Sequence, residues 1–147
     1  MVEDMVINNR EISVVKYSTK EDWLKNIPNN NWLCVIIEDD APRRYLEEVI
    51  NKIIEKDACY VCCIGSSCEK THDLVDEEIA FREVDIDQLY LPSHMIMTTW
   101  HDDSLKEAIW DALNVTFHES IVIDKVVFLD MTDGAEKVEE TLKLFII

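Results

Sequence analysis

Acidic and polar side chains gather in four segments, each directly after a stretch that predicts a β-strand: residues 38–40, 65–68, 98–103 and 130–133. Carboxylate oxygens are the hard ligands that Mg²⁺ prefers, so these segments could hold a metal ion. Aspartate and serine also begin helices, because they satisfy free backbone N–H groups and complement the helix dipole. Since helix starts alone explain the four segments, we predict no metal site, no cofactor and no catalytic residue.

A second constellation combines Cys68 with His72, one turn apart on a predicted helix, where the two side chains can meet. Such a pair could act as a nucleophile and its base, or supply half of a zinc site. The sequence offers no second Cys/His pair at metal spacing and no group that would orient the histidine. We therefore interpret Cys68 as a core residue, and His72 with its acidic neighbours as a solvated helix face.

The chain carries a large negative charge: 31 aspartates and glutamates against 14 lysines and arginines give a formal charge of −17 over 147 residues. A surface this anionic repels nucleic acid and anionic membranes, and it attracts basic molecules from a distance. Uncompensated like charge also costs stability, and a basic partner relieves that cost when it binds. The charge therefore predicts an acidic patch that binds a basic protein, and it argues against nucleic-acid and membrane binding.

Composition limits the class of protein further. The first residues lack the basic start and apolar stretch of a signal peptide, and no apolar run approaches the ~20 residues that cross a bilayer. The five cysteines are odd in number, unlike the even count typical of a disulfide framework. The two glycines, Gly65 and Gly134, are too few for a glycine-rich phosphate loop. We expect a cytoplasmic protein with reduced thiols.

Strand and helix patterns alternate along the chain. Runs of apolar and β-branched residues predict strands over residues 12–17, 32–37, 58–64, 95–100 and 125–129. Capping residues ahead of apolar residues at helical spacing predict helix starts at Ser18, Asp40, Ser66, Ser104 and Asp133.

This alternation is typical of βαβ units. It predicts a single α/β domain over residues 1–147, built as a three-layer α/β/α sandwich around a mostly parallel sheet of about five strands. In outline the fold is flavodoxin-like or Rossmann-like. Residues 81–93 alternate acidic and apolar side chains around Pro92, and they predict a long loop or a short edge strand.

The size, acidity and lack of a catalytic motif make the chain similar to the small acidic immunity proteins of bacterial contact-dependent and polymorphic toxin systems. Two segments, Cys68-Glu69-x-x-His72-Asp73-x-x-Asp76-Glu77-Glu78 and Met97-Thr98-Thr99-Trp100-His101-Asp102-Asp103, also look like those of an uncharacterised bacterial domain family. The resemblance to immunity proteins implies a protein that is not an enzyme. It would bind a cognate basic toxin domain, a nuclease, and block its active site.

In this hypothesis the acidic face imitates nucleic-acid phosphates, and a tryptophan anchors the interface. The predicted contacts with the basic partner are Asp73, Asp76, Glu77, Glu78, Glu83, Asp85, Asp87, Trp100, His101, Asp102 and Asp103. The competing hypothesis is a Mg²⁺-dependent hydrolase, or a small-molecule-binding α/β protein, that uses the acidic residues at the carboxyl ends of the strands.

Overall fold

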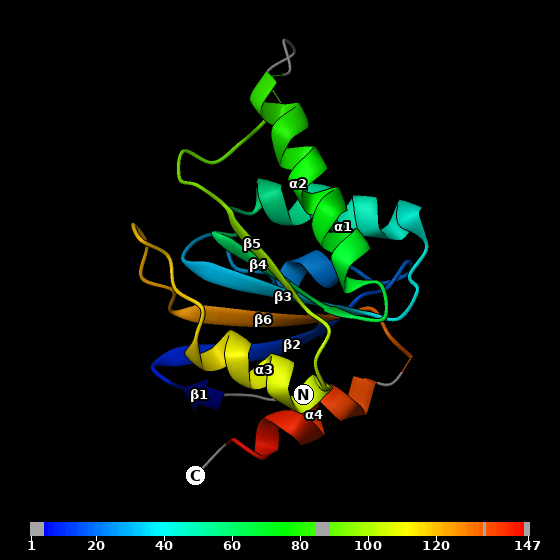
Figure 1. Cartoon of the computed structure of the whole chain (residues 1–147), viewed down its shortest axis with the longest axis vertical. Helices are drawn as coiled ribbons and strands as arrows, with labels where there is room; N and C mark the ends of the chain where they lie inside the picture. Colours follow the sequence, from blue (N-terminus) through cyan, green and yellow to red (C-terminus); the bar gives the residue numbers. More distant parts are fainter. Residues whose placement is uncertain (1–4, 85–88, 134, 146–147) are drawn as a thin grey trace.

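Strands and helices alternate along the chain in a mixed α/β fold (Figure 1). The computed structural model describes residues 5–84, 89–133 and 135–145. In chain order the elements are β1 (Met5–Ile7), β2 (Arg10–Lys16), the 3₁₀ helix η1 (Trp23–Asn26), β3 (Trp32–Glu38), α1 (Arg43–Glu55), β4 (Tyr60–Gly65), α2 (Cys68–Val84), β5 (Met97–His101), α3 (Leu105–Asn114), β6 (Lys125–Asp130) and α4 (Ala135–Lys143).

The strands form one six-stranded sheet in the order β1-β2-β6-β3-β4-β5. Strands β2 to β6 pair in parallel, so their carboxyl ends meet at one edge of the sheet, and β5 is an outer strand. The last strand, β6, returns to the interior between β2 and β3. This order differs from the flavodoxin and Rossmann orders, so any likeness to those folds rests on the alternation of strands and helices.

Strand β1 is the element that the sequence analysis missed, and it raises the count from about five strands to six. It pairs antiparallel with β2 through the turn at Asn8 and Asn9, whose φ angles are 53° and 62°. Two consecutive positive φ angles match the hairpin turn whose twist fits that of the flanking strands, and asparagine tolerates this conformation. The Asn-Asn pair was therefore the available sequence signal.

Buried apolar residues form two clusters. One contains residues of η1, α1 and α2, and the other contains residues of α3 and α4. Strand β3 is buried along its whole length and contributes alternate residues to the two clusters: Cys34 and Ile36 to the first, Leu33, Val35 and Ile37 to the second. The apolar run predicted as a central strand is thus confirmed, because a strand covered on both faces needs apolar side chains in both directions.

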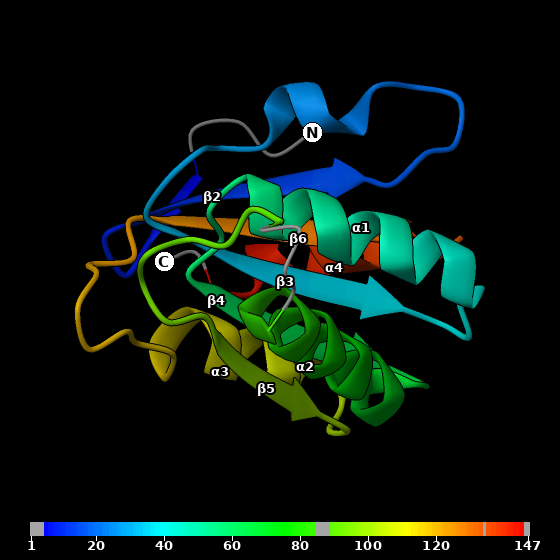
Figure 2. The ribbon, with the colours of Figure 1, turned by 90° about the horizontal axis from the view of Figure 1, so that it is seen from above.

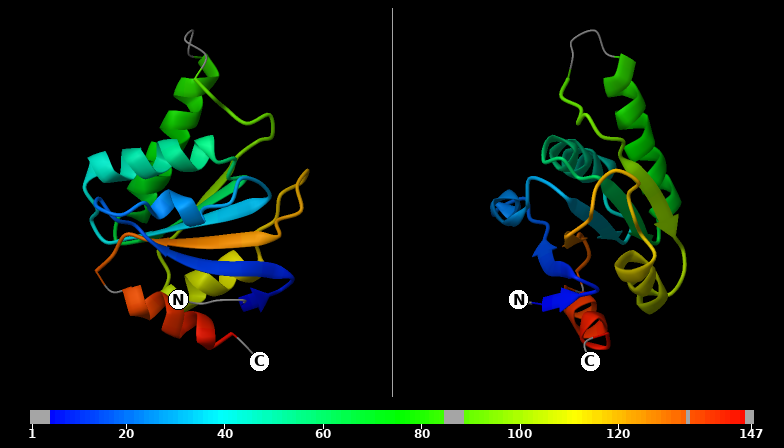
Figure 3. Two further views of the ribbon diagram at one scale, coloured as in Figure 1. Left: turned by 180° about the vertical axis from the view of Figure 1, so that it is seen from behind. Right: turned by 90° about the vertical axis from the view of Figure 1, so that its left-hand side faces the viewer.

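The helices differ in how far they extend past the sheet. In Figure 2, α1 and α2 lie next to each other, and Figure 1 shows the C-terminal part of α2 projecting beyond the rest of the molecule. Residues 81–84 therefore continue α2, where the sequence predicted a loop or an edge strand. Figure 3 shows η1 on the side of α1, with α4 towards the other end of the molecule. No helix in the described part of the chain is long and apolar enough to cross a membrane.

Two buried arginines tie helices in place. Arg10 donates hydrogen bonds to carbonyl oxygens at the C-terminal end of α3 and to Thr116, where a cation also complements the helix dipole. Arg82 of α2 donates to Asn51 of α1 and to the carbonyl oxygen of Tyr90, and it pairs with Glu78. Arg82 therefore fixes α2 against α1, so that the projecting helix is held by a buried charge with several partners.

Two predicted helix starts are wrong and one is confirmed. The hydroxyl of Ser104 accepts a hydrogen bond from the Glu107 N–H, as the predicted capping box requires. Helix α1 instead begins after Pro42 without a side-chain cap, because Asp40 has a φ of 51° and its carboxylate accepts from the Ser67 hydroxyl. Ser66 is the second wrong helix start, because its hydroxyl donates to Asp39 in the neighbouring loop and α2 begins at Cys68.

Two more predicted starts have different outcomes. The hydroxyl of Ser18 accepts from the N–H groups of Lys20 and Glu21, but the helix that follows begins later and is capped by Asp22. Ser18 therefore closes a turn ahead of η1. The capping box predicted from Asp133 to Glu136 includes Gly134, which lies outside the described residues.

Gly65 ends β4 at a point where the backbone of β3 comes very close. A Cβ atom at this position would lie 1.8 Å from the carbonyl oxygen of Glu38, and the φ of Gly65 is 133°. Both the close approach and the positive φ require glycine.

We expect Gly65→Ala to destabilise the protein by about 2 kcal/mol or more, because the strands must separate or the turn must change conformation. Urea unfolding followed by circular dichroism measures the change. Glu119→Ala, at an exposed position, serves as the control and should stay within ~0.5 kcal/mol of the wild type. Equal stability of the two variants would contradict the close approach.

Candidate functional site

The N-terminal half of α2 lies along β5, and polar side chains join the two elements. The hydroxyl of Thr98 in β5 donates to Oδ1 of Asp76 at 2.7 Å, and it also lies 3.2 Å from Nε2 of His72. The same histidine nitrogen lies 3.5 Å from Oδ2 of Asp76. These contacts align one side of α2 with the outer strand of the sheet, so that carboxylates of α2 and Asp102, directly after β5, share one surface.

A groove of about 540 Å³ opens between the start of α2 and the end of β5. Glu69 and Asp73 line it from α2, while Trp100 and Asp102 line it from β5 and the residue that follows. The β4–α2 turn, residues 65–68, and Lys70 complete the lining. Three carboxylates thus face one lysine, and we call this surface the acidic groove.

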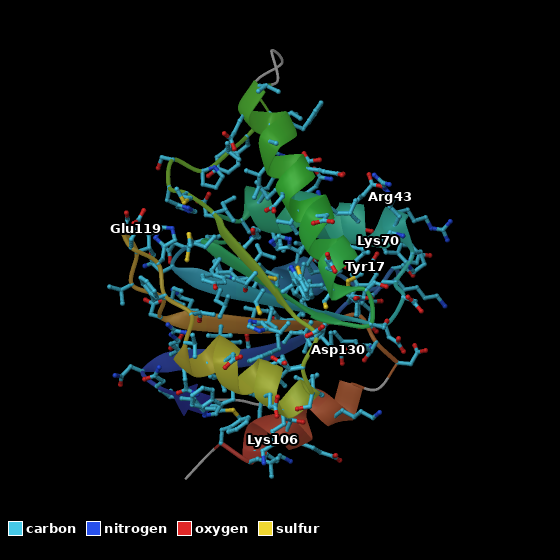
Figure 4. The ribbon with its side chains drawn as sticks, in the orientation of Figure 1. Tyr17, Arg43, Lys70, Lys106, Glu119 and Asp130 are labelled. Carbon is cyan, nitrogen blue, oxygen red and sulfur yellow. The ribbon has the colours of Figure 1, made fainter. Side chains whose placement is uncertain are left out.

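The acidic groove lies at the edge of the sheet where the parallel strands end. Figure 4 shows Lys70 and Asp130 on this side of the molecule and Glu119 on the opposite side. In parallel α/β sheets this edge is where ligands usually bind. Glu119 therefore offers an acidic position far from the groove for comparison.

The structure brings together only part of the predicted contact set. Asp73, Trp100 and Asp102 line the acidic groove, and Asp76 lies beside it through Thr98. His101 lies on the other side of β5, because consecutive strand residues alternate, and it is close to Asp103 and to Asp111 of α3.

The remaining predicted contacts lie elsewhere. Glu77 and Glu78 line a separate hollow between α1 and α2 that also contains Arg43, and Glu78 is paired with the buried Arg82 at 2.8 Å. Glu83 is exposed near the C-terminal end of α2. Asp85 and Asp87 lie outside the described residues. The carboxylates of α2 therefore divide between the acidic groove and the α1 side.

The acidic residues after β3 form hydrogen bonds with the turn after β4. The Ser66 hydroxyl donates to Oδ1 of Asp39 at 2.8 Å, and the Ser67 hydroxyl donates to Oδ1 of Asp40 at 2.7 Å. The Ser67 N–H donates to Oε1 of Glu38, also at 2.8 Å. These carboxylates hold two loops together, which agrees with a structural role for this segment.

Two buried carboxylates stand at the strand ends. Glu38 and Asp130 are both essentially inaccessible, and each keeps one carboxylate oxygen without a hydrogen-bond partner among the described residues. Asp130 is paired in register with Ile37, so it faces the α3–α4 cluster, whereas Glu38 points to the opposite face. Since the two side chains point apart, they do not form a catalytic pair.

Burial raises the pKa of the Glu38 carboxyl above its ordinary value, and hydrogen bonds from backbone N–H groups partly oppose this shift. The folded protein therefore holds the Glu38 proton more tightly than the unfolded chain does. The stabilisation from this group is fully present below the ordinary pKa of 4.5, and it is lost as pH rises through the folded-state pKa.

We expect the unfolding free energy of the wild type, relative to Glu38→Gln, to fall as pH rises from below 4.5 and to level off above the folded-state pKa. Urea titrations across this pH range measure the difference between the two proteins. Glu119→Gln, at an exposed position, should show no such trend. A relative stability that rises with pH would mean that Glu38 is stabilised as the carboxylate.

Cys68 does not have the environment of a nucleophile. Its side chain is buried, and burial raises the pKa of the thiol above its ordinary value, with Asp102 and Glu38 adding to the shift. Catalytic thiols have lowered pKa values in electropositive surroundings. The other four cysteines are also buried, and all five are free thiols. The interpretation of Cys68 as a core residue is confirmed.

We expect none of the five thiols to react with iodoacetamide at pH 7 in the folded protein, and all five to react in denaturant, because buried thiols are protonated and inaccessible. Mass spectrometry counts the labels. Glu119→Cys provides an exposed thiol that should label without denaturant. Fast labelling of Cys68 in the folded wild type would show that the thiol is accessible and reactive.

A second group of polar side chains lies on the α3 side of β5. Nδ1 of His101 lies 3.8 Å from Oδ2 of Asp103 and 3.6 Å from Oδ2 of Asp111. His101 and Asp103 were predicted from the sequence as partner contacts, whereas Asp111 was not. Asp111 could have been noticed in the sequence as a carboxylate directly before Ala112, in a helix whose buried residues are apolar.

A family model described as Domain of unknown function (DUF7684) matches residues 12–146, which is nearly the whole chain. The match begins within β2 and includes every element that forms the acidic groove. No curated protein and no solved structure matches the chain.

Proposed function

The chain belongs to the DUF7684 family, and we propose that it is a non-enzymatic binding protein whose acidic groove receives basic side chains of a partner protein. The partner class that we propose is the basic toxin domain, a nuclease, of a bacterial contact-dependent or polymorphic toxin system. The chain would then act as the cytoplasmic immunity protein that blocks the active site of that domain.

The observation that carries this proposal is the excess of carboxylates in the acidic groove. Glu69, Asp73 and Asp102 face a single lysine there, and none of the three has an ion pair with a lysine or arginine among the described residues. Carboxylates close together repel one another, and a basic partner removes that repulsion when it binds. The groove therefore suits an Arg or Lys side chain better than it suits an anion.

Trp100 gives the groove an aromatic surface. It is 37% exposed at the end of an outer strand, next to Asp102. Tryptophan in a partly buried position commonly contributes much of the energy of a protein interface, and its ring attracts cations over its face. A guanidinium in the groove would thus contact carboxylates and the indole together.

Blocking a nuclease fits this chemistry because nucleases bind phosphates with basic clefts. A protein that places carboxylates in such a cleft competes directly with the nucleic acid. The net charge of −17 would also speed the encounter with a basic domain through long-range attraction.

The competing hydrolase proposal would use the acidic residues at the carboxyl ends of the strands, among them those at the ends of β3 and β6. Serine hydroxyls already hydrogen-bond Asp39 and Asp40, and Thr132 donates twice to Oδ1 of Asp130. Carboxylates that hold loops in this way favour the binding-protein proposal.

We also infer a three-layer arrangement in which the sheet lies between two layers of helices. The two buried clusters, each with its own pair of helices, support it. In this arrangement the acidic groove opens at the sheet edge between a strand end and a helix start, where ligand sites of α/β proteins commonly lie.

The test is binding to the basic domain encoded directly upstream of this gene, measured by isothermal titration calorimetry over a series of salt concentrations. We expect affinity to fall steeply with salt, and Asp73→Lys and Asp102→Lys each to weaken binding by about tenfold or more, or ~1.4 kcal/mol. Reversing a charge within the groove replaces attraction by repulsion.

Glu119→Lys introduces the same change in charge on the opposite side of the molecule and should stay within about twofold of wild-type affinity, because screening limits its reach. If all three variants lose the same amount of affinity, net charge alone would explain binding. Binding that does not depend on salt, or an upstream gene that encodes no basic domain, would contradict the proposal.

A further inference from the structure

We propose that His101, Asp103 and Asp111 bind a divalent transition-metal ion, with Zn²⁺ as its best representative. The site lies on the α3 side of β5, away from the acidic groove, and it does not depend on the proposed binding function. One ring nitrogen and one oxygen from each carboxylate lie within 4.8 Å of one another, and this is the only such trio in the part of the chain whose side chains the structure describes.

The two distances from the histidine nitrogen are close to those between ligands that share an ion. Ligands ~2.0–2.2 Å from a tetrahedral zinc ion lie roughly 3.3–3.6 Å from one another. Nδ1 of His101 lies 3.6 Å from Oδ2 of Asp111 and 3.8 Å from Oδ2 of Asp103. The two carboxylate oxygens lie within 4.8 Å of each other, so movements of these partly exposed side chains would bring the three ligands around one ion.

Direct pairing between the histidine and the carboxylates explains the geometry less well. Both carboxylates approach the same nitrogen, Nδ1, which carries at most one hydrogen. Both distances also exceed the 2.7–3.2 Å typical of an N–H···O hydrogen bond. Neither Asp103 nor Asp111 has an ion pair with a lysine or arginine in the described part of the chain. A bound cation would satisfy both carboxylates at once.

Two of the three ligands lie in regular structure, and Asp103 lies in the short turn between β5 and α3. His101 ends β5 and is paired in register with Ile64 of β4. Asp103 directly precedes Ser104, whose side chain caps α3. Asp111 lies on α3 beside the buried Ala112, so its helix is packed on the core. Backbone positions that are held in this way reduce the ordering that ion binding requires.

The donor set indicates the class of ion. Imidazole nitrogen suits Zn²⁺ and its first-row neighbours, whereas Mg²⁺ and Ca²⁺ prefer oxygen alone. Three protein ligands would leave at least one coordination position for water, as in open zinc sites. The side chains of His101, Asp103 and Asp111 are 23%, 44% and 31% exposed, so solvent and ions can reach them.

The experiment is isothermal titration calorimetry of the untagged protein with ZnCl₂, beside MnCl₂ and MgCl₂, in a reducing agent that does not bind metals. We expect one saturable Zn²⁺ site per chain and much weaker binding of Mg²⁺. Asp111→Asn should weaken Zn²⁺ binding by at least about tenfold, and His101→Gln should abolish it. In NMR spectra of ¹⁵N-labelled imidazole rings, the His101 signals should shift when Zn²⁺ is added.

Two matched variants test the location. Asp102→Asn removes a neighbouring carboxylate that lines the acidic groove, and it should leave Zn²⁺ affinity within about twofold. His94→Gln removes one ring of the His94–His118 pair, whose centroids lie 5.9 Å apart, and it should also leave binding unchanged.

The remaining outcomes overturn the proposal. They are the absence of saturable binding, equal affinity of the wild type and Asp111→Asn, or loss of binding in His94→Gln. Circular dichroism of each variant, compared with the wild type, identifies any loss that comes from unfolding. Asp103→Asn then supplies a second carboxylate variant, with the same expected loss of affinity.

Discussion

The close contact between Gly65 and the backbone of Glu38 determines where α2 begins, and the rest of the candidate site depends on that position. With no Cβ at residue 65, the end of β4 approaches the carbonyl oxygen of Glu38 and turns directly into the helix. The Ser67 N–H then donates to the Glu38 carboxylate, and the Ser67 carbonyl oxygen accepts from Thr71 in the first turn of α2. A shift of this turn would move every α2 carboxylate relative to β5. The acidic groove is therefore a consequence of one backbone contact, secured by a buried carboxylate whose ionisation costs stability.

The sequence predicted most elements that depend on local patterns, apart from the β1–β2 hairpin, and it did not predict the arrangements that depend on contacts between distant segments. Strand β3 and the apolar side of α1 were predictable because continuous burial and helical spacing leave a direct trace in residue types. The strand order was not, because nothing local states that β6 inserts between β2 and β3. Asp40 and Ser66 were assigned to helix caps, since capping residues and loop-locking residues are the same types. Only the packed structure distinguishes the two roles, through the bonds between the β3–α1 and β4–α2 loops.

The candidate site was predictable in part for the same reason. The sequence identified Asp73, Trp100 and Asp102, but it treated the acidic residues of α2 as one surface. Glu69 and Asp73 lie in the first turns of α2 and line the groove, whereas Glu77 and Glu78 lie further along the helix and line the hollow that contains Arg43. Asp111 was missed because it lies in a helix whose main pattern is apolar, and its position near His101 follows from how α3 packs beside β5.

The outer strand β5 gives these two surfaces different chemistry within a few residues. Side chains alternate along a strand, so Thr98 and Trp100 face the α2 side while His101 faces α3. The α2 side has an aromatic ring and three carboxylates in the groove, which suits a large, flat cation such as guanidinium. The α3 side has an imidazole nitrogen between two carboxylates, which suits a small ion of high charge.

Because both ligands would be cations, an ion at His101 would reduce the negative potential at the groove and weaken the attraction for a basic partner. By thermodynamic reciprocity, the bound partner would lower the affinity for the ion by the same factor. The two sites would therefore compete through charge without sharing a residue.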